Sequence, residues 1–215
     1  MDDDLRRVPR AALVDALRSV PPDAPTLCEG WQARHLAAHI VLRERAPQRI
    51  ALGAVRGQDA AVALGDGADY EELIREVEEG PSPLSPMAWS ARTNVLEFVV
   101  HALDVLRASD NPQVRDRELE LTPGVRSMMW SSLLPILRIG GVRRAGRTAE
   151  VGIIVVVPHG PRSVVARGEH SVVVTGPEED LALVAMGRAR HARVTVTGPP
   201  EAVAAFREAM DWPAA

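Results

Sequence analysis

The chain has 215 residues and a formal net charge of −4, and 46% of its residues are hydrophobic and 25% are charged. This composition predicts a soluble globular protein, long enough for one large domain or two small ones. The mild acidity argues against nucleic acid as a partner. No apolar run is long enough to cross a bilayer, and the first residues lack the basic and apolar stretches of a signal peptide. We therefore expect a cytoplasmic protein with no membrane partner.

The residue types used in the chain indicate the kind of organism it comes from and limit the cysteine chemistry it can carry. All 25 basic residues are arginine, which together with the Ala, Val, Gly and Pro content is typical of GC-rich coding, as in actinobacteria. Cys28 is the only cysteine, so an internal disulfide and a multi-cysteine zinc site are excluded. We interpret Cys28 as a small buried hydrophobe rather than a nucleophile.

The spacing of apolar residues predicts four helices in the N-terminal half, at residues 4–19, 32–52, 70–79 and 88–109. The Ala- and Gly-rich residues 53–69 are expected to form a flexible connection, and residues 80–86 a loop. Four helices with short or medium links favour an up-and-down bundle, a fold that often holds a metal between inward side chains.

The pattern changes after residues 110–112 (Asp-Asn-Pro). A helix is expected at 123–137, ended by Gly140 and Gly141, and further helices at 178–187 and 200–210. Runs rich in β-branched residues predict strands at 150–157, 163–167, 171–175 and 192–197. The fold class is therefore α+β with two domains, at residues 1–112 and 118–215.

A polar stripe runs along the otherwise apolar helix expected at 88–109. A helix advances about 100° per residue, so residues three or four apart share one side. Arg92 and Arg107 fall on roughly the opposite side and are expected to face water. The stripe then points inward, where an ionisable side chain is costly unless it is paired or binds a metal. It has four members: Asn94, Glu97, His101 and Asp104.

His39 faces inward from the helix at 32–52 by the same argument, whereas Glu44 falls on the opposite side. His39, Glu97 and His101 supply two imidazoles and a carboxylate, a set that suits zinc and leaves one position for water or a substrate atom. Iron, nickel and manganese stay chemically open. The alternative is a group of hydrogen-bonded core residues without a metal.

Two neighbouring residues each have two interpretations. Asp104 either orients an imidazole ligand from behind or pairs with Arg107. His35 is either a fourth ligand or a hydrogen-bond partner near the helix start, and we favour the hydrogen bond.

Three stretches form a pattern: residues 30–31 (Gly-Trp), 35–39 (His-Leu-Ala-Ala-His) and 94–104 (Asn-Val-Leu-Glu-Phe-Val-Val-His-Ala-Leu-Asp). This pattern resembles the mycothiol-dependent maleylpyruvate isomerase family of the DinB-like superfamily, and within it an actinobacterial metal-binding subgroup. Residues 181–188 and 192–198 resemble the C-terminal domain of that family. The resemblance implies a DinB-like four-helix bundle followed by an α+β domain similar to sterol carrier proteins.

The resemblance also implies a chemistry. His39, Glu97 and His101 take the places of the zinc ligands of the family, with water or the sulfur of mycothiol in the remaining position. The implied activity is a mycothiol-dependent isomerase or S-transferase whose metal activates the thiol toward a small electrophilic substrate, with a homodimer as a candidate assembly. Ala102 and Leu103 depart from the subgroup, in which we expect His and Glu there, and this departure concerns the substrate rather than the ligands.

Two other functions fit the same residues. One is a metal-dependent hydrolase with metal-bound water as the nucleophile, and the other is a non-enzymatic module with a structural metal. Whether the chain is an enzyme stays open at this point, because fold resemblance does not define a reaction. A basic patch either receives a carboxylate substrate or is simply solvated, and we favour the solvated patch; its members are Arg138, Arg143, Arg144 and Arg147.

Overall fold

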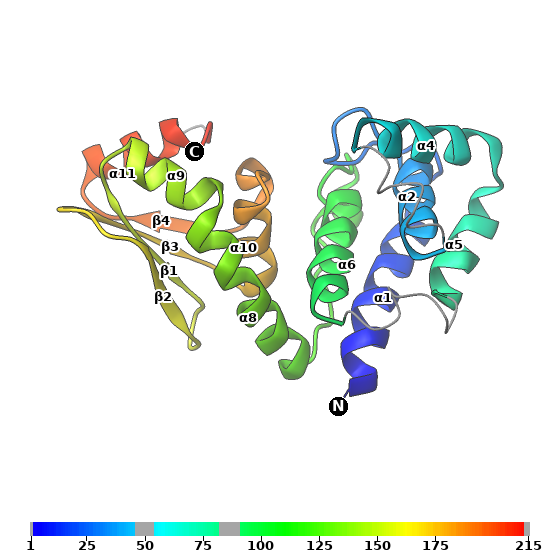
Figure 1. Ribbon diagram of the computed structural model, residues 1–215, viewed down its shortest axis with the longest axis horizontal. Coiled ribbons are helices and arrows are strands. Elements are labelled where there is room, and N and C mark those ends of the chain that lie inside the picture. The colour runs from blue at the N-terminus through cyan, green and yellow to red at the C-terminus, as the bar shows by residue number, and fades with distance from the viewer. Residues whose placement is uncertain (1, 46–53, 82–90, 213–215) are drawn as a thin grey trace. The chain divides into compact units, whose positions relative to one another are not determined.

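The structure is a computed structural model that describes residues 2–45, 54–81 and 91–212. Its backbone contacts divide the chain into two compact units, Met1–Val125 and Arg126–Ala215 (Figure 1). Unit 1 is helical, and unit 2 combines helices with a small sheet. The α+β class predicted from the sequence is thereby confirmed, whereas the domain limits 1–112 and 118–215 and the four-helix bundle stay predictions.

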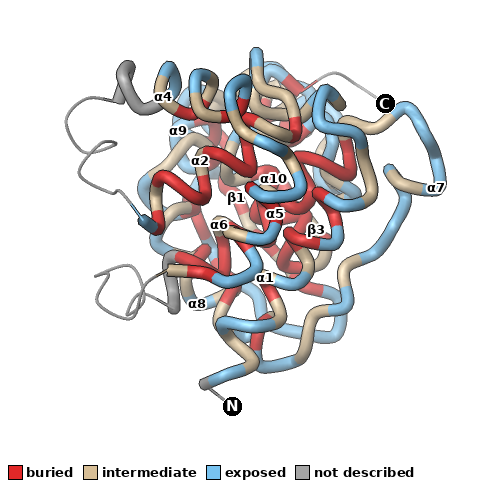
Figure 2. Tube along the Cα trace, turned by 90° about the vertical axis from the view of Figure 1, so that its right-hand side faces the viewer, coloured by how far each residue is buried: buried red, intermediate tan, exposed pale blue. Residues whose placement is uncertain are grey.

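Unit 1 is built from helices that pack in pairs. Helix α1 packs against α5 and α6, and α2 packs against α4 and α5. Their buried apolar side chains form one core, with Leu36 and Phe98 at most 1% exposed. Figure 2 shows the buried residues of these helices in red. The helices are α1 (Asp2–Arg18), α2 (Ala33–Arg45), α4 (Ala54–Gly67), α5 (Tyr70–Glu79), α6 (Ala91–Leu106) and the short, unburied α7 (Pro112–Arg115).

Helix α4 corrects the expectation of a flexible connection at residues 53–69. Ala61 is fully buried, and a Cβ added at Gly65 would lie 2.8 Å from the His35 ring and 3.0 Å from the carbonyl oxygen of Arg34. The small residues therefore let α4 approach α2 closely, and their abundance reflects packing rather than flexibility. The predicted ends of the neighbouring elements at 46–52, 82–86 and 88–90 lie outside the described residues.

Two charged residues that were expected to face water are buried. Glu44 is 1% exposed, because Arg10 of α1 binds both of its carboxylate oxygens, at 2.9 and 2.5 Å. Arg107 is 8% exposed and donates to the backbone carbonyl of Arg115 at 3.2 Å. In both cases the partner lies on another element, which helical spacing alone does not reveal.

Unit 2 carries a four-stranded sheet in the order β2-β1-β3-β4. The β1–β2 and β3–β4 pairs are antiparallel, and the central β1–β3 pair is parallel. Helix α9 packs against β1 and β2, and α11 packs against β3. The strands are β1 (Gly152–Val156), β2 (Arg162–Ala166), β3 (Ser171–Thr175) and β4 (Thr195–Thr197), and the helices are α8 (Pro123–Ile139), α9 (Gly141–Thr148), α10 (Glu178–Ala185), the 3₁₀ turn η2 (Ala189–His191) and α11 (Pro200–Ala209).

Helix α9 begins at the glycine pair that was expected only to end a helix. Gly140 is its N-cap, and α8 ends immediately before it. A Cβ at Gly146 would lie 2.8 Å from Ile153 and 3.2 Å from Ala166, so this glycine seats α9 closely on the sheet. Within the described part of the chain, no helix has the length and apolarity needed to cross a membrane.

Candidate metal centre

The three ligands predicted from the sequence lie together in unit 1. His39 comes from α2, and Glu97 and His101 come from successive turns of α6. One donor atom of each lies within 4.8 Å of the other two, and their side chains are 22%, 17% and 14% exposed. The two imidazole rings stand edge to face with their centroids 5.6 Å apart. The three side chains of the cluster are thus partly exposed among the described residues.

One distance within the cluster matches the spacing of two donors on a small divalent ion. His39 Nε2 lies 3.5 Å from Glu97 Oε1. Two donor atoms that each lie about 2.0–2.1 Å from a tetrahedral zinc ion are about 3.4 Å from one another. The donor set and this separation are therefore suitable for zinc, although the assignment of the three residues as ligands stays a prediction.

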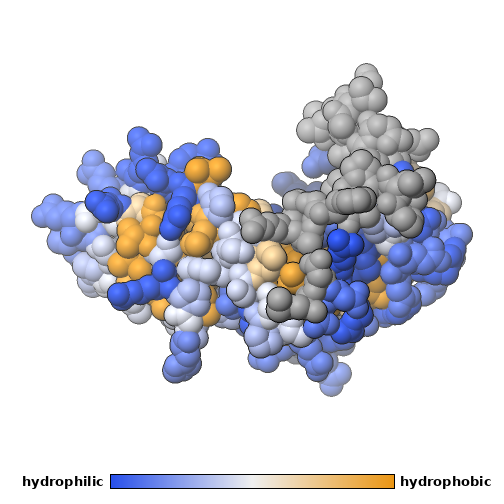
Figure 3. Space-filling view, turned by 60° about the horizontal axis from the view of Figure 1, so that its bottom comes forward, coloured by the Kyte–Doolittle hydropathy of each residue, from blue (hydrophilic) through white to orange (hydrophobic). Residues whose placement is uncertain are grey.

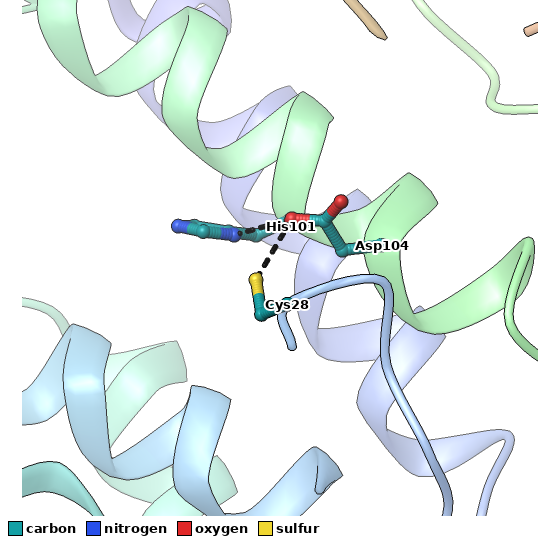
Figure 4. A group of neighbouring side chains, drawn as sticks. All are labelled: Cys28, His101 and Asp104. Atoms are coloured by element: carbon teal, nitrogen blue, oxygen red, sulfur yellow. Dashed lines mark hydrogen bonds and ion pairs between the residues drawn. The ribbon is translucent and has the colours of Figure 1, made fainter. Parts of the chain in front are cut away.

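Asp104 lies behind His101 and is fully buried. Its Oδ2 accepts a hydrogen bond from His101 Nδ1 at 2.9 Å and one from the Cys28 thiol at 3.3 Å (Figure 4). A hydrogen bond at Nδ1 leaves the lone pair on Nε2, the nitrogen that a metal would take. Asp104 thus occupies the position expected of a residue that orients an imidazole ligand.

The segment between α1 and α2 brings two further side chains to the site. The Leu27 amide donates to the carbonyl oxygen of Asp104 at 2.9 Å, which attaches this segment to α6. Cys28 then reaches Asp104, and the Trp31 ring lies 5.2 Å from the His39 ring, tilted by 52°. Cys28, His101 and Asp104 form a second group of closely spaced donors, because one ligand atom of each lies within 4.8 Å of the other two.

Arg43, one turn after His39 on α2, holds the outer side of Glu97. Its Nη2 lies 2.5 Å from Glu97 Oε2 and donates to Asn94 Oδ1 at 2.8 Å. The ion pair engages one carboxylate oxygen and leaves Oε1 facing His39. Arg43 Nη1 is buried without a hydrogen-bond partner among the described residues.

His35 has both ring nitrogens engaged and is not a member of the ligand cluster. Its Nδ1 accepts from the Gln32 amide at 3.2 Å, and its Nε2 lies 3.0 Å from Asp66 Oδ1 on α4. The hydrogen bond from His35 lowers the pKa of the Asp66 carboxyl. The structure agrees with the hydrogen-bonding role that we favoured for His35.

Arg43 and Cys28 were not predicted as site residues. The spacing between His39 and Arg43 places both on one helix face and is a signal that the sequence does carry. Cys28 lies in an irregular segment, where no periodicity indicates the direction of a side chain. Ala102 and Leu103, the two departures from the resembling subgroup, are at most 1% exposed, and Ala102 belongs to the apolar core of unit 1.

Comparison with known proteins agrees with this picture. Residues 9–82 match the family model described as the mycothiol maleylpyruvate isomerase N-terminal domain. Two crystal structures share the fold, that of the mycothiol-dependent maleylpyruvate isomerase and that of its histidine-to-alanine mutant, at 17% and 16% identity. Each has a TM-score of 0.58 and covers 90% of both chains. No curated protein matches the sequence.

The family match and the fold match cover the parts of the chain on which the resemblance was based. The family model covers α2 and with it His39, and the fold match extends over nearly the whole chain. The resemblance inferred from the sequence is therefore confirmed: residues 9–82 match the mycothiol maleylpyruvate isomerase N-terminal domain model, and the chain shares the fold of the isomerase structures.

Proposed function

We propose that this protein binds a divalent metal, zinc in the first instance, through His39, Glu97 and His101. With mycothiol as its thiol co-substrate, it acts on a small electrophilic substrate as an isomerase or S-transferase. The observation that carries the proposal is the cluster of only three donors among the described residues, each of them partly exposed. Structural zinc sites are closed by four protein ligands, whereas sites that activate a ligand keep one position open. The family match supports mycothiol as the thiol.

The proposed roles divide between binding and positioning. When bound, a divalent ion acts as a Lewis acid that lowers the pKa of a coordinated thiol and so favours the nucleophilic thiolate. Asp104 keeps the proton of His101 on Nδ1 through the 2.9 Å hydrogen bond, so that Nε2 stays available for coordination. Trp31 limits the rotation of the His39 ring from one side.

Arg43 sets the charge of the site. Because it neutralises Glu97, the two imidazoles and the paired carboxylate together add no net charge to a divalent ion. A more positive centre favours an anionic ligand in the open position, either a thiolate or a carboxylate of the substrate. Arg43 is therefore proposed as a positioning residue that also tunes the site toward anions.

The first experiment tests the ligands. Protein purified without added metal is expected to contain about one divalent ion per chain by elemental analysis, and His39→Ala and Glu97→Ala are expected to lose it. His35→Ala is the matched control, because it removes the same side chain one turn earlier on α2 and should retain the metal. Equal metal content in His39→Ala and the unsubstituted protein would disprove the ligand assignment.

The second experiment tests the thiol. Cobalt-substituted protein titrated with mycothiol is expected to develop a sulfur-to-cobalt charge-transfer band, and S-methyl mycothiol, which lacks the thiol, is expected to leave the spectrum unchanged. Turnover is then measured with maleylpyruvate. Metal binding without a thiol band, together with hydrolysis of an ester panel, would favour the hydrolase, and a fold that unfolds on chelation without any turnover would favour a structural metal.

A further inference from the structure

Unit 2 contains a pocket that is separate from the residues of the candidate metal centre. Its volume is about 550 Å³, within the range of small-molecule sites. Four arginines surround it, from the end of α8, from two successive turns of α9 and from the residue after β2. An apolar wall comes from β2 itself. The lining residues are Arg138, Arg143, Arg147, Val164, Val165, Ala166 and Arg167.

The arginines of this pocket lack internal anions. Among the described residues, none of the four guanidinium groups forms an ion pair with a carboxylate. Two of them are nevertheless held in place, because Arg138 donates to Ser163 Oγ at 3.0 Å and Arg143 donates to the carbonyl oxygen of Arg138 at 3.3 Å. Anchored guanidinium groups with unused donors are prepared for an anion, since little side-chain entropy remains to be lost.

The pocket also exposes apolar surface. Val164 on its wall is 54% exposed, and Ile139, which follows Arg138 in the chain but is not part of the lining, is 81% exposed. They are the two large hydrophobic residues described as exposed in the chain. Figure 3 shows that unit 2 carries hydrophobic surface bordered by strongly hydrophilic side chains. A purely solvated basic patch would need no such apolar wall.

We propose that this pocket binds a small organic dianion, whose two acidic groups contact the arginines and whose apolar body lies against β2. Carboxylate and phosphate groups both suit guanidinium forks, so the acidic group is one or the other. The volume favours a small molecule over a protein surface. The proposal departs from our sequence-based preference for a merely solvated patch and does not depend on the metal or on mycothiol.

The test uses the full chain and three ligands: adipate, hexanoate and inorganic pyrophosphate. Binding is followed by calorimetry and by chemical shifts of the arginine side chains, before and after treatment with a chelator. Adipate is expected to bind saturably and about tenfold or more tightly than hexanoate, because the second acidic group adds a charge-assisted contact. Chelation is expected to change nothing.

The informative variant is Arg147→Gln with Arg167→Gln, because neither side chain has an internal partner among the described residues whose loss would disturb the fold. It is expected to weaken adipate binding about tenfold or more. The matched control is Arg144→Gln with Arg162→Gln, which removes the same charge from α9 and β2 outside the pocket. It is expected to stay within about twofold, the effect of long-range charge alone.

Three results would overturn the proposal. The first is the absence of saturable adipate binding. The second is equal weakening in both double variants, which would indicate a diffuse electrostatic effect. The third is tighter binding of pyrophosphate than of adipate, together with adipate binding that the Val164→Ser substitution leaves unaltered. The last outcome would leave an inorganic anion site without an organic ligand. Saturable binding of both anions with loss confined to the pocket variant would support the site and identify its preferred acidic group.

Discussion

The interior of unit 1 and the pocket of unit 2 use arginine in opposite ways. In unit 1, Arg10 and Arg43 are largely buried and each binds a carboxylate, of Glu44 and Glu97, at 2.5 Å. In unit 2, the arginines of the pocket beside β2 are exposed and have no carboxylate within the described residues. Arg126 of unit 2, by contrast, pairs with Glu179 at 2.5 Å. The difference therefore belongs to the pocket rather than to the whole unit.

This contrast indicates where each charge finds its partner. A buried cation must be matched within the fold, because an unpaired charge in the interior is strongly destabilising. An exposed cation gains little from a surface ion pair and can be kept for a ligand. The pair of Arg43 with Glu97 thus belongs to the candidate metal centre, and the missing pairing in the pocket is what the proposed anion site depends on.

The largest effect is expected from breaking the buried pair of unit 1. Glu44→Ala leaves Arg10 without its bidentate partner, although Arg10 also lies 4.7 Å over the Phe98 ring. We expect the free energy of unfolding to fall by about 3–5 kcal/mol, measured by urea denaturation. Glu78→Ala removes the exposed partner of Arg18 and should cost about 1 kcal/mol or less. Similar losses in both variants would contradict the contrast.

The second effect concerns the support of the metal ligand. Asp104→Asn weakens the hydrogen bond that orients His101, and we expect metal affinity to fall about 10–100-fold in competition with a chromogenic chelator. Cys28→Ala removes only the weaker thiol donor to the same carboxylate, so its effect should be smaller. An unchanged affinity in folded Asp104→Asn would show that the carboxylate merely fills space behind the ring.

Local spacing in the sequence predicts part of this site. Glu97 and His101 lie one turn apart, so one helix places both on the same side whatever the rest of the chain does. The inward direction of His39 follows from the apolar residues around it in α2. The helical spacing of apolar residues also predicts α1 and α5, because each of these helices buries one face.

Partners remote in sequence could not be predicted in this way. Glu44 is buried because Arg10, 34 residues earlier, reaches it from α1. Cys28 approaches Asp104 across 76 residues through a segment without periodicity. Helix α4 was missed because small residues serve both flexible links and close helix packing, and only the contact between Gly65 and α2 distinguishes the two.

A smaller effect is expected at the paired arginine of unit 2. Burial raises the pKa of the Glu179 carboxyl, and Arg126 opposes this shift. The folded state then holds the proton more tightly than the unfolded state, so stability falls as the pH rises from about 4.3 through the folded pKa, by at most about 1.4 kcal/mol per pH unit. Glu179→Gln should remove this slope in urea denaturation across that interval. In Glu179→Gln, Arg126 still has Glu178 as a partner at 3.6 Å, which limits the loss of stability from the missing ion pair.

The smallest effect is expected at the pair between the buried His35 and the exposed Asp66, which tests whether a pair with an exposed carboxylate matters in unit 1. The hydrogen bond from His35 lowers the pKa of Asp66, so its contribution is complete above the unfolded carboxyl pKa of about 3.9 and is lost as the pH falls through the folded pKa. Asp66→Asn should therefore differ from the unsubstituted protein in its urea midpoint above about pH 4 and converge with it at lower pH. Asp59→Asn, an exposed aspartate on the same helix, should show no such convergence. If Asp66→Asn and Asp59→Asn behave alike, the pair between His35 and the exposed Asp66 contributes nothing, and the stabilising pairs of unit 1 are confined to those whose carboxylate is largely buried.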